Sequence, residues 1–209
     1  MPAVYTLKQS DIRSLSRFYD SRFKRYGYDP RSLGWVLGSQ QIRFKALAAI
    51  GSLKGCSILD VGCGFGDLYG YLLASDVSVK YTGVDLNPDF IKIARQTYPD
   101  ADFIVADFEE GNIKGKFDWS FESGIFNLKL ADNTNMIHNT LQKMFKMSKK
   151  GVAADFLDAG TGLKDSTMHY ADPAELAAFC GTLTKRYTIK SDYRPAEFCV
   201  YLYRDRPLE

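Results

Sequence analysis

The sequence predicts an α/β fold in which two layers of helices cover a seven-stranded, mostly parallel sheet. Three observations support this. From residue 55 onward, short apolar runs alternate with stretches of helical periodicity. The first apolar run, SILDVG, leads directly into a glycine-rich loop. The last two runs are only a few residues apart, which is too short for a parallel crossover and predicts a hairpin with one reversed strand.

Apolar and β-branched runs bounded by turn residues predict the strands. They cover residues 57–62, 81–86, 103–107, 117–123, 151–157, 188–193 and 198–204. The sheet is therefore expected to end in an antiparallel C-terminal strand.

Helical spacing of apolar residues predicts the helices. They cover residues 10–26, 38–50, 67–74, 89–98, 134–147 and 173–184. Ser10 is expected to cap the first helix and Gly27 to end it. The first two helices precede the sheet. We therefore expect one domain over 1–209, with an N-terminal helical extension (1–50) attached to an α/β core (55–205).

Composition excludes several protein classes. The chain has 209 residues, a net charge of +2 and 45% hydrophobic residues, as expected of an ordinary globular protein and not of a dedicated nucleic-acid binder. No run approaches the roughly 18 apolar residues that span a bilayer. Four scattered cysteines form no metal or disulfide pattern. We expect a cytoplasmic monomer or homodimer that binds neither membrane nor metal. Binding to nucleic acid is not expected.

The loop after the first predicted strand, LDVGCGFGDL, suits the close approach of a ligand. Gly62, Gly64 and Gly66 allow a sharp turn without Cβ clashes, and the helix that follows presents free N–H groups. A dinucleotide fingerprint would have its third glycine at the position of Asp67, where a carboxylate would repel a pyrophosphate. A nicotinamide-dependent oxidoreductase is thus disfavoured. The Lys-Ser/Thr pair of a P-loop is also missing after these glycines.

Acidic residues end the next two predicted strands. Asp85, in GVDLNP, can accept hydrogen bonds from both hydroxyls of a ribose at the crevice outside the strand ends. Asp107, in IVADF, can accept a hydrogen bond from an exocyclic amine, and Phe108 can stack on a flat base. A helix cap for Asp85 and a plain surface acid for Asp107 are the alternatives.

The succession LDVGCGFG, GVDLNP, VADF and FDWSFESGIF resembles the class I S-adenosylmethionine-dependent methyltransferases. The resemblance covers residues 55–205 and implies a Rossmann-like three-layer sandwich. It also implies methyl transfer from S-adenosylmethionine, with S-adenosylhomocysteine as the product.

The resemblance implies a role for each matching residue. Those that would line the methionine portion of the cofactor are Asp60, Gly62, Gly64 and Gly66. Asp85 would bind the ribose, Leu86 would touch the adenine, and Asp107 and Phe108 would bracket the base. Those that would border the methyl group and the acceptor are Glu122, Ser123 and Gly124.

The N-terminal extension resembles the helical segments that cover the active site in related methyltransferases. Tyr26, Trp35, Gln41 and Arg43 are candidates for such a lid, with Tyr26 and Trp35 facing the acceptor. The planar donor fork of Arg43 would suit the cofactor carboxylate. The alternative is that Trp35 is only a core residue and Arg43 a solvated charge.

In-line methyl transfer requires alignment more than a strong catalytic group. His169 is the candidate general base, because its loop faces the acceptor in this fold. Tyr170 and Asp158 are candidates for the same wall, although a surface position is the alternative for all three.

A small-molecule acceptor is expected, because the chain is short and near neutral and has no added recognition domain. The sequence ESGIFNLK stands where methyltransferases of DNA bases or glutamine often carry Asn/Asp-Pro-Pro-Tyr/Phe, which argues against those acceptors. RNA or protein acceptors and a non-catalytic, cofactor-binding scaffold remain as alternatives.

Overall fold

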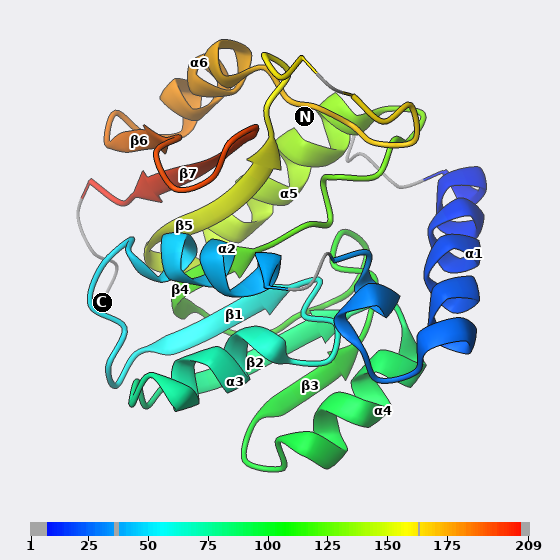
Figure 1. The fold of residues 1–209 in the computed structure, drawn as a ribbon. Helices are drawn as coiled ribbons and strands as arrows, with labels where there is room; N and C mark the ends of the chain where they lie inside the picture. The colour runs from blue at the N-terminus through cyan, green and yellow to red at the C-terminus, as the bar shows by residue number, and fades with distance from the viewer. Residues whose placement is uncertain (1–7, 36–37, 163, 206–209) are drawn as a thin grey trace.

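A computed structural model describes residues 8–35, 38–162 and 164–205 of the chain. Its centre is a seven-stranded sheet in the order β3-β2-β1-β4-β5-β7-β6 (Figure 1). The strands are β1 (Ser57–Val61), β2 (Lys80–Asp85), β3 (Asp102–Val105), β4 (Phe117–Glu122), β5 (Ser148–Leu157), β6 (Tyr187–Lys190) and β7 (Glu197–Tyr203). Strands β1 to β5 pair in parallel, and β7 is antiparallel to both β5 and β6. The predicted reversed C-terminal strand is confirmed.

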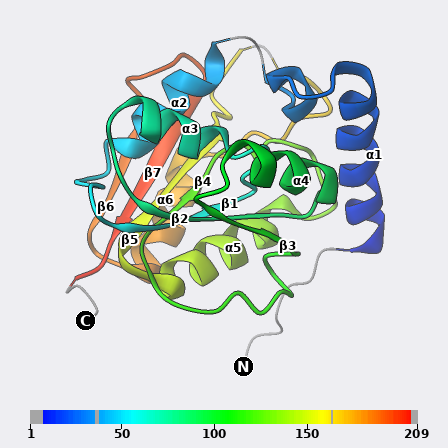
Figure 2. The same cartoon turned by 90° about the horizontal axis from the view of Figure 1, so that it is seen from below.

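Helices cover both faces of this sheet. They are α1 (Gln9–Tyr26), the 3-10 helix η1 (Pro30–Leu33), α2 (Ser39–Ala48), α3 (Asp67–Ala74), α4 (Pro88–Thr97), α5 (Asn133–Met147) and α6 (Pro173–Leu183). Figure 2 shows α2, α3 and α4 on one face and α5 on the other. The three-layer architecture expected from the sequence is therefore present. Among the described helices, none is long and apolar enough to cross a bilayer.

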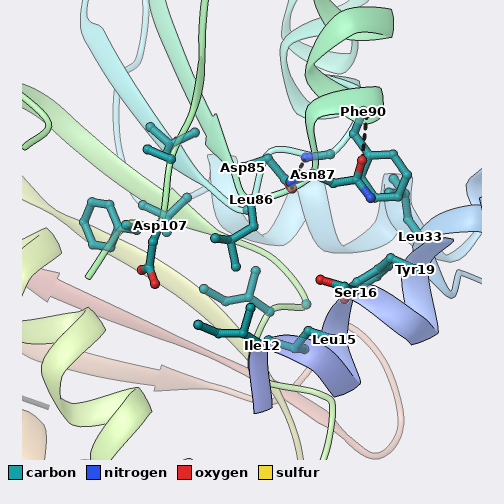
Figure 3. Close-up of a pocket in the computed structure, with 18 of the residues that line it drawn as sticks. Ile12, Leu15, Ser16, Tyr19, Leu33, Asp85, Leu86, Asn87, Phe90 and Asp107 are labelled. Carbon is teal, nitrogen blue, oxygen red and sulfur yellow. Dashed lines mark hydrogen bonds between the residues drawn. The ribbon is translucent and has the colours of Figure 1, made fainter. Parts of the chain in front are cut away.

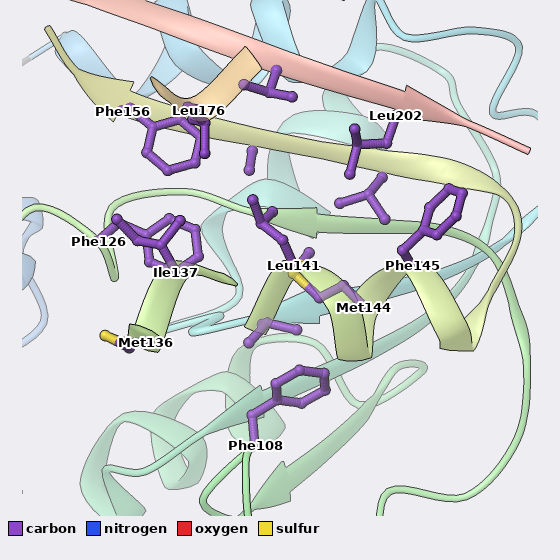
Figure 4. Packing of buried hydrophobic residues seen from close by; sticks show 14 of the residues in the cluster. Phe108, Phe126, Met136, Ile137, Leu141, Met144, Phe145, Phe156, Leu176 and Leu202 are labelled. Atoms are coloured by element: carbon purple, nitrogen blue, oxygen red, sulfur yellow. The ribbon is translucent and has the colours of Figure 1, made fainter. Parts of the chain in front are cut away.

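Alternating side chains divide the core into two halves. Leu59 and Val61 of β1 pack on the α5 and α6 side, whereas Ile58 packs on the α2 and α3 side. On the α5 side, Leu141 and Met144 are fully buried beneath the strands (Figure 4). Tight packing on both faces holds the strand ends in fixed positions.

The strand order reverses at β1, whose neighbours are β2 on one side and β4 on the other. At such a switch point, the loops that follow the strands diverge and leave a crevice at their carboxyl ends. Helix α1 stands beside this edge, toward which β1 points (Figure 1). The fold thus places helix α1 of the N-terminal extension beside the crevice.

Helix α1 is held there by two polar contacts, one in its first turn and one in its second half. Asp11 Oδ1 accepts the N–H of Ala131 at 3.2 Å, and Asn87 Nδ2 donates to Asp20 Oδ1 at 3.1 Å. The prediction that Ser10 caps the helix is wrong: the helix begins one residue earlier, so Ser10 lies in its first turn. Gly27 ends it as predicted, with φ 62°.

Helix α2 is fastened to β7 by a buried ion pair. The Nε and Nη2 atoms of Arg43 donate to the two carboxylate oxygens of Glu197, the first at 2.8 Å. The side chains of both residues are almost fully buried. Two hydroxyls add to this contact, because Tyr201 donates to the carbonyl of Ala46 and Tyr203 to that of Ile50.

We expect Arg43→Met to lower the free energy of unfolding by about 3 kcal/mol, since it leaves Glu197 buried with only Arg194 as its partner. Chemical denaturation measures this loss. The matched control is Lys190→Met, which removes a pair with the exposed Asp192 and should cost less than about 1 kcal/mol. Equal losses in the two variants would contradict the role of the buried pair.

Candidate active site

A cavity of about 370 Å³ lies at the carboxyl ends of the strands, within the size range of small-ligand sites. Loops after β1, β2, β3 and β4 form its inner wall, and α1 forms the wall opposite (Figure 3). Of the residues predicted from sequence, those that line it are Trp35, Gly62, Gly64, Asp85, Leu86, Asp107, Phe108, Ser123 and Gly124.

The glycine loop approaches its neighbours too closely for side chains. Gly62 and Gly64 have φ values of 76° and 53°, where other residues are strained. A Cβ on Gly64 would lie 3.0 Å from Leu33. Gly66 also has positive φ, but it lies outside the cavity lining, and its Cβ would meet Phe103 at 2.8 Å. The first two glycines therefore shape the cavity, and Gly66 allows α3 to pack.

Asp85 ends β2 at the centre of the inner wall. Its Oδ2 accepts the N–H of Gly64 at 2.9 Å, and its Oδ1 accepts the N–H of Asn87 at 2.8 Å. Desolvation by the surrounding protein raises the pKa of Asp85, and these N–H groups oppose that rise. Asn87, not Asp85, caps α4. The Asp85 carboxylate is therefore held in one orientation, and each of its oxygens can accept another hydrogen bond.

The loop after β3 contributes the far end of the inner wall. Asp107 Oδ1 accepts the N–H of Glu109 at 2.8 Å, and the ring of Phe108 is buried at the cavity wall. Lys143 of α5 holds this loop, because its Nζ donates to the carbonyls of Phe108, Glu109 and Gly111. Lys143 was not predicted from the sequence, because no neighbouring motif distinguishes it from any other lysine in a helix of ordinary periodicity.

Helix α1 supplies lining residues for which the sequence predicted no role beyond a helix over 10–26. Ile12, Leu15, Ser16 and Tyr19 line the cavity opposite Leu86 and Asp107 (Figure 3). Burial, then the charges of Asp85 and Glu122, raise the pKa of Tyr19. The phenol of Tyr19 is therefore neutral.

A second, smaller cavity of about 130 Å³ adjoins the first. Four residues line both cavities: Tyr19, Leu33, Trp35 and Gly124. Trp35 packs directly on Gly124, where a Cβ would lie 2.6 Å from the indole ring. The remaining walls of the smaller cavity come from α1, Gly34, α2, the loop after β4, the end of β5 and the segments around Met168 and Arg194.

Two buried acids lie behind the walls of these cavities. Asp60 and Glu122 lie outside the described linings of both. Tyr81 donates a hydrogen bond to Asp60, but burial still raises the pKa of Asp60 to about 7. Glu122 Oε1 accepts the N–H of Ile125 at 2.7 Å, and burial raises its pKa well above the ordinary value. Glu122 thus shapes the loop after β4 from within the protein.

Ser123 connects the cavity lining to a further buried acid. It lines the larger cavity, and its hydroxyl donates to Oδ2 of Asp155 on β5. Burial raises the pKa of Asp155 to about 6, whereas Arg43 lowers it.

Three residues expected in the lid do not line the larger cavity. Arg43 lines only the smaller one, where its guanidinium binds Glu197 and lies 4.2 Å from the centre of the Trp35 ring. The prediction that Arg43 pairs with the cofactor carboxylate is therefore wrong, because Glu197 on β7 already binds its guanidinium. Tyr26 stacks with the guanidinium of Arg31 outside both cavities, and Gln41 is exposed.

The residues predicted around the general base also lie elsewhere. His169 and Tyr170 are absent from the described linings of both cavities. The backbone N–H of His169 donates to the carbonyl of Asn127 at 2.9 Å, and burial lowers the pKa of its imidazole. The Tyr170 hydroxyl accepts the N–H of Asp165, and Asp158 accepts that of Gly160. These contacts organise the loop after β5.

Comparison with known proteins agrees with this architecture. Residues 52–174 match a family model described as a methyltransferase domain. A Mycobacterium tuberculosis protein assigned as a methyltransferase is 32% identical over 155 residues, which span 69% of this chain and 90% of the relative. The malonyl-[acyl-carrier protein] O-methyltransferase of Priestia megaterium is 29% identical over 51% of this chain and 38% of its own length.

Solved structures share the fold at low sequence identity. Magnesium protoporphyrin IX methyltransferase from Synechocystis, determined with S-adenosylhomocysteine, has a TM-score of 0.67 and 16% identity, covering 93% of this chain and all of its own. Human N-acetylserotonin methyltransferase, in complex with S-adenosylmethionine, has a TM-score of 0.67 and 14% identity, covering 96% of this chain and 60% of its own. The chain belongs to the methyltransferase domain family, and it shares its fold with S-adenosylmethionine-dependent members of that class of enzyme.

Proposed function

We propose that the larger cavity binds S-adenosylmethionine and that the smaller cavity binds a small methyl acceptor. The observation that carries this proposal is the Asp85 carboxylate, which two backbone N–H groups fix at the wall of the larger cavity. The junction lined by Tyr19, Leu33, Trp35 and Gly124 would then be the place of methyl transfer.

The residues present fit each part of the cofactor. The fixed carboxylate of Asp85 suits the paired hydroxyls of a ribose. Leu86, which is 41% exposed, and Phe108 offer apolar surfaces for the adenine, and the second oxygen of Asp107 can accept its amine. Gly62 and Gly64 leave room for the methionine portion. These roles were predicted from the family resemblance, and the lining of the cavity supports them.

When bound, S-adenosylmethionine supplies a methyl group on a positively charged sulfur. Transfer would join that carbon to a lone pair of the acceptor, leave the electron pair of the carbon–sulfur bond on sulfur and release the acceptor's proton. The chain's own residues align the two partners and exclude water. Helix α1, Leu33 and Trp35 serve as the lid, because they form the outer wall of both cavities. We assign His169 no step, since it lies outside their described linings.

A volume of about 130 Å³ admits a small acceptor, or the single reacting base or side chain of an RNA or a protein. The names of the similar proteins agree in part, since a porphyrin and N-acetylserotonin are small molecules, whereas the Priestia enzyme acts on a carrier-protein conjugate. A scaffold that binds the cofactor without catalysis would show binding but no transfer to any acceptor. The cytoplasmic location and the monomeric or homodimeric state stay predictions.

We expect Asp85→Ala to weaken binding of S-adenosylmethionine and S-adenosylhomocysteine by about 1–3 kcal/mol, a rise in Kd of roughly 5- to 150-fold, because a charged hydrogen-bond partner is lost. Asp85→Asn should lie between this variant and the parent. Calorimetric titration measures the affinities. The control is Asp100→Ala, an exposed acid between α4 and β3 that should leave Kd unchanged. Parent-like affinity in a folded Asp85→Ala protein would remove Asp85 from the site.

We expect Lys143→Met to raise the Kd for S-adenosylhomocysteine by roughly 3- to 10-fold, because the three carbonyls held by Nζ lose their common donor. Lys146→Met, an exposed position on the same helix, is the matched control and should bind normally. If the two variants bind alike, the loop after β3 does not depend on Lys143 for its shape.

A further inference from the structure

The charged side chains described in the lining of the smaller cavity all carry the same sign. Among the described residues that line it, the charged side chains are Arg43 and Arg194, and both are cationic. Glu197 binds the two guanidiniums but lies outside the lining. Asp155 also lies outside it and accepts the hydroxyl of Ser123. A ligand in this cavity therefore meets positive charge directly and the compensating acids only behind it.

The two arginines differ in how many donors they have left. Arg43 binds both oxygens of Glu197 through Nε and Nη2, and its Nη1 lies 3.4 Å from the Ser39 hydroxyl. Arg194 donates to Glu197 only through Nη1, at 2.5 Å. Its side chain is 28% exposed, and its Nε and Nη2 have no partner among the described residues. Arg194 can therefore bind a carboxylate through two parallel hydrogen bonds.

The rest of the cavity suits a flat, largely apolar body. Its walls are made by Phe18, Leu33, Trp35, Leu128, Leu157 and Met168. A volume of about 130 Å³ is close to the roughly 150 Å³ of an apolar cavity that takes up benzene in another protein. The space fits a body of about one six-membered ring.

A hydrogen-bond acceptor stands near the junction with the larger cavity. Asn127 Oδ1 is buried without a partner among the described residues. The amide of Asn127 is close to Gly124, since its Nδ2 would lie 3.7 Å from a Cβ on that glycine. Gly124 lines both cavities. A hydroxyl group on the ligand can satisfy Oδ1 at the place where the methyl group would arrive.

We propose that the smaller cavity binds a one-ring hydroxylated aromatic acid, with its carboxylate on Arg194 and its hydroxyl beside Asn127 and Gly124. The inference rests on the proposed function and names the acceptor class for it. The hydroxyl oxygen forms the new bond to the methyl carbon, the carbon–sulfur bond breaks with its electrons on sulfur, and the phenolic proton passes to solvent.

The test uses the full chain saturated with S-adenosylhomocysteine and three probes: 4-hydroxybenzoate, phenol, which lacks the carboxylate, and benzoate, which lacks the hydroxyl. Ligand-observed NMR titrations give the affinities. We expect 4-hydroxybenzoate to bind about tenfold more tightly than phenol, as a charge-assisted pair predicts. It should also bind more tightly than benzoate. Equal binding of 4-hydroxybenzoate and phenol would overturn the inference.

Arg194→Met should weaken 4-hydroxybenzoate binding about tenfold and leave phenol unchanged, whereas Arg194→Lys should keep most of the preference. Arg13→Met, an exposed position on α1, is the control and should bind like the parent. The affinity for S-adenosylhomocysteine is measured for every variant and shows that each is folded. If the parent chain does not bind S-adenosylhomocysteine, the proposed function itself is refuted. Intact cofactor binding with no preference for the acid would refute only the acceptor class.

Discussion

The site depends on the carboxylate of Asp85, which ties the ends of two neighbouring parallel strands together. By accepting the N–H groups of Gly64 and Asn87, it joins the glycine loop after β1 to the start of α4 after β2. Burial disfavours the ionised carboxylate, and these two N–H groups offset part of that cost. The result is a preorganised acceptor at the switch point of the sheet, where ligands of open α/β folds bind.

The N-terminal extension completes what the sheet alone leaves open. Leu33 packs against Gly64 and Trp35 against Gly124, so the two glycines determine how closely the extension approaches the strand ends. The buried pair of Arg43 and Glu197 anchors the same extension to β7, at the far side of the sheet. Packing and electrostatics therefore act together: the pair that stabilises the fold also fixes one wall of the smaller cavity and leaves Arg194 with spare donors.

Local signals made the fold and the inner wall predictable. Strand ends, glycines and the acid after β2 are each marked by residues within a few positions of one another, and the cavity lining includes Gly64, Asp85 and Phe108 as expected. Distant pairs were not predictable. Glu197, 154 positions from Arg43, determines where that guanidinium points, and Lys143 acts on a loop more than 30 positions earlier. Single-sequence patterns carry periodicity but not the identity of such partners.

A crystal structure of the chain with S-adenosylhomocysteine tests the central claim most directly. The account predicts both ribose hydroxyls within hydrogen-bond distance of the Asp85 carboxylate, which keeps its bonds to Gly64 and Asn87. It also predicts the adenine between Leu86 and Phe108, beneath α1. A ligand bound elsewhere, or one whose ribose makes no contact with Asp85, would contradict it.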